Sequence, residues 1–103
     1  MEAGRELDAR VTEELWKDTN PYPSFKPSTN AAHAWEVVEK LIQDNLNWDV
    51  EVKWSSVEKE WYVTILDRSG LGTHVKQEVC FVWAETAPLA ICLAALKVVG
   101  EEG

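Results

Sequence analysis

The sequence ETAPLAICLAALKVVG, residues 85–100, predicts the helix around which the fold is built. Thr86 can cap its first free amides, and Pro88 suits the first turn because a proline there loses no hydrogen bond. Gly100 is typical of a helix end, and Lys97 places a cation at the negative end of the dipole. Almost every other side chain is apolar, and a helix that is apolar on all sides is buried on most of them. We therefore expect a central core helix over residues 86–99, too short at roughly 20 Å to cross a bilayer.

Composition limits the class of protein. The chain has 103 residues, 46% of them hydrophobic, which suits one domain with a core of its own over residues 1–103. Its net charge of -8 repels phosphate backbones, argues against nucleic-acid binding, and suits either a basic protein partner or simple solubility. We expect no membrane segment and an intracellular location. Cys80 and Cys92 lie in apolar runs, so we expect buried free thiols, with a disulfide as the open alternative.

Two further helices are expected before the strands. Leu7, Val11 and Leu15 recur every four residues and predict a helix over residues 5–17 with a thin apolar stripe. Three prolines mark residues 18–30 as a connector. The start signal Ser28-Thr29-Asn30 then opens an amphipathic helix over residues 31–44.

Three strands are expected over residues 48–55, 61–67 and 75–84, and their short polar connectors favour an antiparallel meander. The fold class is therefore α+β, in the order α-α-β-β-β-α. The second sheet face, with Tyr62, Leu66, Cys80 and Val82, is expected to be solvated, covered by the first helix or packed on another subunit. The face expected to pack on the helices carries Trp48, Val50, Val52, Trp54, Trp61, Val63, Ile65, Val75, Val79, Phe81 and Trp83.

Catalytic patterns are scarce. Gly70-Leu71-Gly72 lies between strands without the helix or the Lys-Ser/Thr pair of a phosphate loop, and no metal-ligand or nucleophile motif occurs. We therefore expect no catalytic residue, no metal and no cofactor. An enzyme would need a cleft that gathers His74 or His33 with carboxylates.

Aromatic residues make binding the favoured class of function. Six tryptophans are many for so small a chain, and tryptophan is enriched at interfaces. A double-stranded-RNA-binding module shares the helix–strand–strand–strand–helix order of residues 31–99, but its last helix should begin with basic residues, and this one begins Glu85-Thr86. The expected ligand-binding residues are Tyr22, Phe25, Trp54, Trp61, Arg68, Thr73 and His74.

Two stretches resemble a known family. PSTNAAHAWEVVEKL, residues 27–41, is similar to the segment Tyr-Ser-Thr-Asp-x-Ala-Ala-Ala-Trp-x-Val-Val-Glu-Lys-Leu of small bacteriophage proteins, the phage ABA sandwich domain family. Residues 84–97 look like the last helix of that family, and residues 5–8 like its first. Pro27, Asn30 and His33 depart from the family pattern. The resemblance implies a phage origin and a helix–sheet–helix layering, and it brings no catalytic residue.

These observations favour a non-catalytic phage accessory protein that binds a host component. By analogy with other small phage proteins, it would block a host protein, including one of host defence, in the cytoplasm of the infected bacterium. The rival hypothesis is capture of a small nucleotide-type signal in an aromatic-lined pocket. The apolar last helix and the excess of tryptophan also suggest a homodimer.

Overall fold

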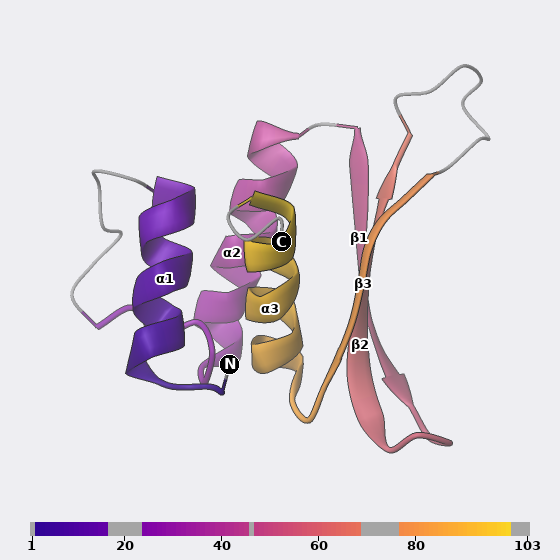
Figure 1. The fold of residues 1–103 in the computed structure, drawn as a ribbon, viewed down its shortest axis with the longest axis horizontal. Coiled ribbons are helices and arrows are strands. Elements are labelled where there is room, and N and C mark those ends of the chain that lie inside the picture. Colours follow the sequence, from indigo (N-terminus) through magenta and orange to yellow (C-terminus); the bar gives the residue numbers. More distant parts are fainter. Residues whose placement is uncertain (1, 17–23, 46, 69–76, 100–103) are drawn as a thin grey trace.

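The computed structural model describes residues 2–16, 24–45, 47–68 and 77–99 (Figure 1). The α+β class and the antiparallel meander predicted from the sequence are confirmed. The elements follow in the order α1 (Arg5–Trp16), α2 (Ala31–Asp44), β1 (Trp48–Ser55), β2 (Glu60–Asp67), β3 (Gln77–Ala84) and α3 (Ala87–Val99).

The observed bounds of α2 and β1 are the expected ones, and β2 and α3 each begin one residue away from the expected start. β2 begins at Glu60, and Thr86 lies just outside α3 as its cap, where its Oγ1 accepts a hydrogen bond from the Leu89 amide at 3.2 Å. The expected ends at Lys17, Val75 and Gly100 lie outside the described residues.

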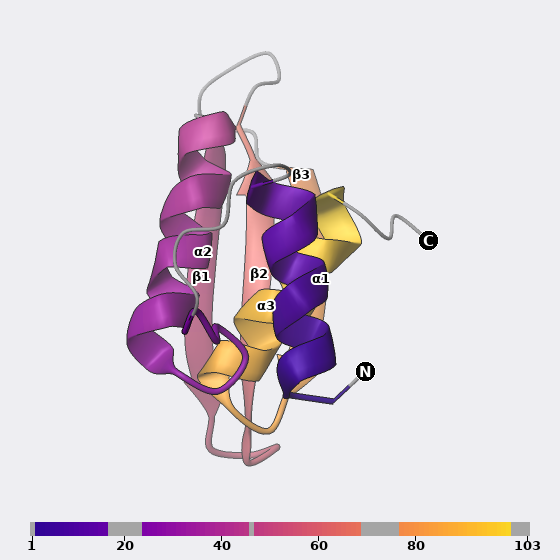
Figure 2. The same ribbon diagram turned by 90° about the vertical axis from the view of Figure 1, so that its left-hand side faces the viewer.

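Helix α3 occupies the centre of the molecule. It contacts α1, α2 and all three strands, and in both ribbon views it lies between α1 and the sheet (Figures 1 and 2). Ala90, Cys92, Ala94 and Ala95 are fully buried. Their small side chains allow neighbouring elements to approach the helix closely. The prediction of a core helix at this position is therefore confirmed.

The layers stack on one side of the sheet. The sheet forms one outer layer, α2 and α3 the middle layer and α1 the other outer layer (Figure 1). This order differs from a helix–sheet–helix arrangement, because α1 packs on α3 and α2 and makes no substantial contact with a strand. The second face of the sheet is therefore not covered by α1.

Helix α1 is tied to the connector before α2 by a buried polar contact. The Asp8 carboxylate Oδ1 accepts a hydrogen bond from the Ser28 amide at 2.8 Å, and Ser28 Oγ accepts one from the Gly4 amide at 2.9 Å. Asp8 and Ser28 are both buried. Leu7 and Val11, fully buried, fasten the same helix to the core.

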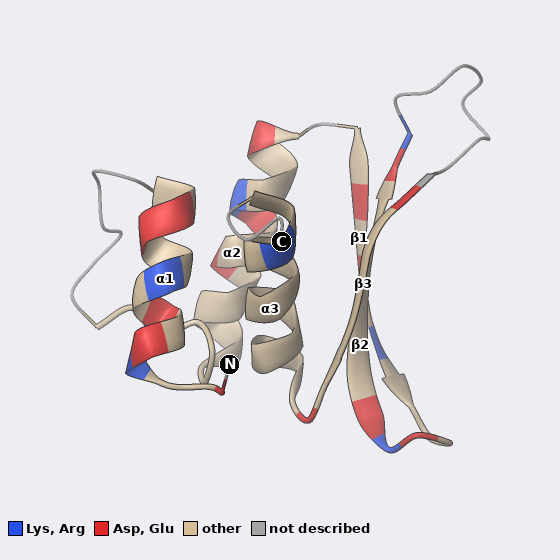
Figure 3. Ribbon diagram, viewed as in Figure 1, with Lys and Arg blue, Asp and Glu red and all other residues tan. Residues whose placement is uncertain are grey.

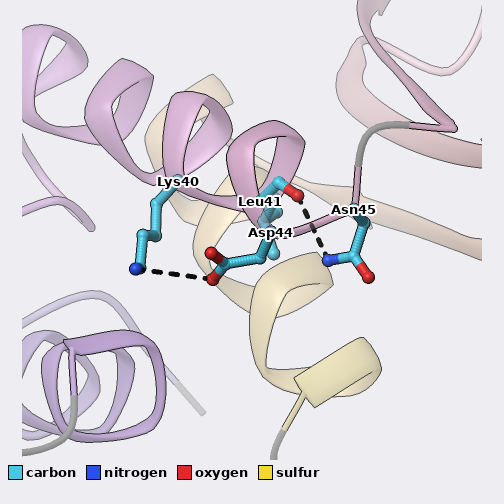
Figure 4. Close-up of polar contacts among 4 residues, drawn as sticks. All are labelled: Lys40, Leu41, Asp44 and Asn45. Carbon is cyan, nitrogen blue, oxygen red and sulfur yellow. Dashed lines mark hydrogen bonds and ion pairs between the residues drawn. The ribbon is translucent and has the colours of Figure 1, made fainter.

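Helix α2 is capped at both ends by asparagine. Asn30 Oδ1 accepts a hydrogen bond from the His33 amide at 3.1 Å. At the other end the Asn45 side chain donates to the Leu41 carbonyl at 3.2 Å, beside an exposed ion pair of Lys40 with Asp44 at 3.5 Å (Figure 4). The expected helix over residues 31–44, with its start signal ending at Asn30, is therefore confirmed.

Candidate functional site

The strand register determines which side chains face away from the helices. Trp61 pairs with Ala84, Val63 with Val82 and Ile65 with Cys80, and the buried members of these pairs place this face against the helices. Side chains alternate along a strand, so the neighbouring pairs lie on the opposite face, which none of the described helices covers. These pairs are Tyr62 with Trp83, Thr64 with Phe81 and Leu66 with Glu78. We call this surface the open face.

The assignment of Val79, Phe81 and Trp83 to the helix side was wrong. All three are among the exposed large apolar residues, Phe81 at 37% and Trp83 at 40% exposure. The helix side of β3 carries Cys80 and Ala84 instead, because α3 lies close: Cys80 Sγ is 3.9 Å from the Ala94 carbonyl oxygen. A register irregularity between Ile65 and Leu66 of β2 also breaks the simple alternation opposite Val79.

Three rings form a continuous cluster on the open face, which we call the aromatic trio: Tyr62, Phe81 and Trp83. Tyr62 stacks on Phe81 with ring centroids 5.3 Å apart and planes 17° from parallel. Trp83 lies 4.9 Å from Tyr62 and 5.6 Å from Phe81 by the same measure. Such clusters of large, rigid rings at a surface are typical of binding sites, where they supply contact area at little entropic cost.

Acidic side chains surround the aromatic trio. Glu51 lies opposite Thr64 and Glu78 opposite Leu66, while Lys53 lies opposite Tyr62 and 3.4 Å from the Glu51 carboxylate. Glu60 begins β2 on the same face. In Figure 3, acidic residues mark the strands and the β1–β2 turn together with basic ones, whereas α3 is uncharged apart from Lys97. The open face therefore combines an apolar centre with a negative surround.

The described members of the expected ligand-binding set lie at three separate places in the fold. Trp54 and Trp61 form a pair, 5.7 Å between centroids, next to the β1–β2 turn. Arg68 lies at the opposite end of the sheet, where its Nε donates to Asp49 at 2.5 Å. Phe25 is buried among the helices. The expected pocket-lining set is therefore not assembled by these four residues, and Tyr22, Thr73 and His74 lie outside the described residues.

Phe25 has a structural role instead. Its ring packs edge-on against Trp16, with centroids 5.2 Å apart, and stacks on His33 at 5.4 Å. His33 Nδ1 in turn accepts a hydrogen bond from the Lys26 amide at 3.0 Å. These contacts fix Phe25 and Lys26 against Trp16 of α1 and His33 of α2.

The two thiols are buried. Cys80 and Cys92 are free cysteines, as expected. Burial raises the pKa of both thiols, and the Asp8 carboxylate raises the pKa of Cys92 further. A raised pKa removes the nucleophilic thiolate at neutral pH, so neither cysteine suits covalent catalysis.

Within the described ranges, no cluster of three His, Cys, Asp or Glu side chains could hold a metal ion. In the same ranges, no helix has the length and apolar character needed to span a membrane.

The fold is an α+β domain with a meander covered on one side by layered helices. The sequence matches the phage ABA sandwich domain family over residues 7–96, and the chain belongs to that family. This match places it among bacteriophage proteins. Comparisons with curated proteins and with solved structures gave no match.

Proposed function

We propose that this chain is a non-catalytic bacteriophage accessory protein that binds a host protein through the open face of its sheet. The observation that carries the proposal is the aromatic trio, three mutually packed rings on a face that no described helix covers. Burying exposed rings of this size against a partner provides a large apolar gain.

The negative charge of the open face favours binding of a basic partner. Glu51, Glu60 and Glu78 lie on this face, where Lys53 pairs with Glu51 and Arg68 with Asp49, and the whole chain carries a net charge of -8. A positively charged partner would be steered toward this surface. Once docked, an arginine of the partner can stack on a trio ring while its guanidinium meets a carboxylate.

Occupying a host surface is sufficient for an inhibitory role. A bound accessory protein blocks a host component without any chemistry, so the proposal extends to antagonism of a host defence protein in the cytoplasm of the infected bacterium. Family membership supports the phage context of this step.

The test compares two variants of exposed apolar residues in an affinity capture from host lysate. Trp83→Ser removes the most exposed ring of the trio, whereas Val99→Ser removes an exposed side chain at the end of α3, away from the open face and from β1, as the control. We expect the wild type and the control to retain the same basic host protein, and Trp83→Ser to lose it at least tenfold. Binding should also weaken as salt rises, because exposed charges are screened.

Two results would contradict the proposal. One is a host partner retained equally by Trp83→Ser and the wild type. The other is thermal stabilisation of the wild type by nucleotides, unchanged in Trp83→Ser, which would favour the capture of a small nucleotide-type signal at a different site.

A further inference from the structure

Strand β1 has a free, regular edge. It is an outer strand of the sheet and pairs with β2 over its whole length, Trp48–Ser55, without a bulge. Among the described residues, the backbone of residues 50–54 forms hydrogen bonds with β2 and with no other element. An edge of this kind is a template for another strand.

The other edge of the sheet is less suitable. β3 carries the register irregularity opposite Ile65 and Leu66, and bulges of this kind blunt an edge by twisting it. Its charged residue within the strand, Glu78, has no cation within β3 to pair with in a second copy. β1, in contrast, carries charges of both signs.

We infer that β1 docks against β1 of a second copy of this chain, antiparallel, with the two Val52 residues facing each other across a twofold axis. A twofold axis perpendicular to the sheet keeps each face on its own side, so paired residues must come from the same face. Only registers centred on a residue meet this condition, and near the middle of β1 these are centred on Glu51, Val52 or Lys53.

The charged side chains of β1 favour one of these three registers. Centring on Val52 places Glu51 of each copy opposite Lys53 of the other, twice. Centring on Glu51 or on Lys53 places two like charges directly opposite each other, which is destabilising. Within one chain, Lys53 already lies 3.4 Å from Glu51. In the Val52 register the four charges therefore alternate in sign around the axis.

The apolar face of β1 fits the same register. Val50 of each copy would lie opposite Trp54 of the other, and Trp54 is 49% exposed in the single chain. Aromatic and β-branched side chains are favourable cross-strand pairs. The register therefore buries apolar surface on the helix side of the sheet while it pairs charges on the open side.

Helix α2 adds an apolar stripe beside this edge. Trp35 and Ile42, 52% and 39% exposed, are seven residues apart and lie on one flank of the helix. Helical spacing places His33, which stacks on Phe25, on the other flank. Phe25 in turn packs on Trp16 of α1, so the His33 flank is the one toward α1. Because α2 also contacts β1, the opposite flank, with Trp35, is the one toward β1. The twofold axis would bring the two α2 helices toward each other there.

The dimer leaves both open faces on the same side of a six-stranded sheet. Two aromatic trios would then face one partner surface, which raises avidity without any new contact. The dimer rests on β1 alone and holds even if the proposed function of the open face does not.

A charge-swap series tests the register by sedimentation or light scattering of the full chain. We expect the wild type at twice the chain mass of 11.7 kDa. Glu51→Lys and Lys53→Glu each create two like-charge pairs and should raise the dimer dissociation constant by about tenfold or more. The double variant E51K/K53E restores opposite signs and should dimerise as the wild type does.

Lys40→Glu is the matched control, because it breaks an exposed ion pair, with Asp44, that lies away from β1. It should leave the mass unchanged, and thermal melting followed by circular dichroism verifies that every variant is folded. A wild type that stays at 11.7 kDa at submillimolar concentration would overturn the proposal. So would a dimer that tolerates both single reversals, or a double variant that stays monomeric.

Discussion

Cys92 illustrates how burial controls chemistry at the scale of one residue. The side chain is fully buried in α3, and burial, with a further contribution from the Asp8 carboxylate, raises its pKa above the ordinary value of 9.0. The unfolded chain loses the thiol proton at lower pH than the folded chain does. The stabilising effect of the neutral thiol is therefore complete below the unfolded pKa and is lost as pH rises above it.

We predict that the free energy of unfolding falls once the pH exceeds about 9, by up to roughly 1.4 kcal/mol per pH unit for Cys92. Urea denaturation at neutral and alkaline pH measures this fall. A Cys92→Ala variant should show a smaller fall, because it lacks this titration. An identical alkaline loss in the two proteins would show that Cys92 is not responsible.

At the scale of elements, most of the fold could be predicted from periodicity. Helix α2 and strands β1 and β2 each carry one clear apolar face, and α3 is apolar on all sides, so their identity and bounds follow from the sequence. β3 is different, because Val79, Cys80, Phe81, Val82 and Trp83 form a continuous apolar run. Either face of β3 could therefore be buried. The large side chains of Val79, Phe81 and Trp83 favour burial of their face, but this face is exposed in the structure.

Packing against α3 resolves the ambiguity. Only small or medium side chains, such as Cys80 and Ala84, fit where α3 approaches the strand, so the large rings of Phe81 and Trp83 face outward. The same ambiguity hides the aromatic trio from sequence reasoning. Residue type alone points to Trp54, Arg68 and Phe25, whereas the trio can be recognised only once it is known which face of β3 is exposed.

The attachment of α1 depends on one buried carboxylate. Replacing Asp8 with alanine would leave the buried Ser28 amide without its acceptor. We predict a loss of about 1–3 kcal/mol of stability in urea denaturation. Asp8→Asn keeps an acceptor oxygen and should lose less, and Glu13→Ala, on the exposed side of α1, should be close to neutral. Equal losses for Asp8→Ala and Glu13→Ala would exclude a special role for this contact.

At the scale of the whole molecule, the arrangement of layers determines where a partner can bind. Because α1, α2 and α3 all stack on one side, no described element covers the other face of the sheet. The acidic surround of that face agrees with the net charge of -8 of the chain. Both proposals use this arrangement: the open face for a host protein and the β1 edge for a second copy.

The most direct test of this arrangement is the rate at which a thiol reagent labels a cysteine introduced on either side of β3. Phe81→Cys places the thiol on the open face, whereas Ala84→Cys places it against the helices, where Ala84 is 7% exposed. Cys80 and Cys92 are buried and provide a slow background. We predict one rapidly labelled thiol per native chain in Phe81→Cys and none in Ala84→Cys. Rapid labelling of Ala84→Cys, with Phe81→Cys protected, would contradict this prediction.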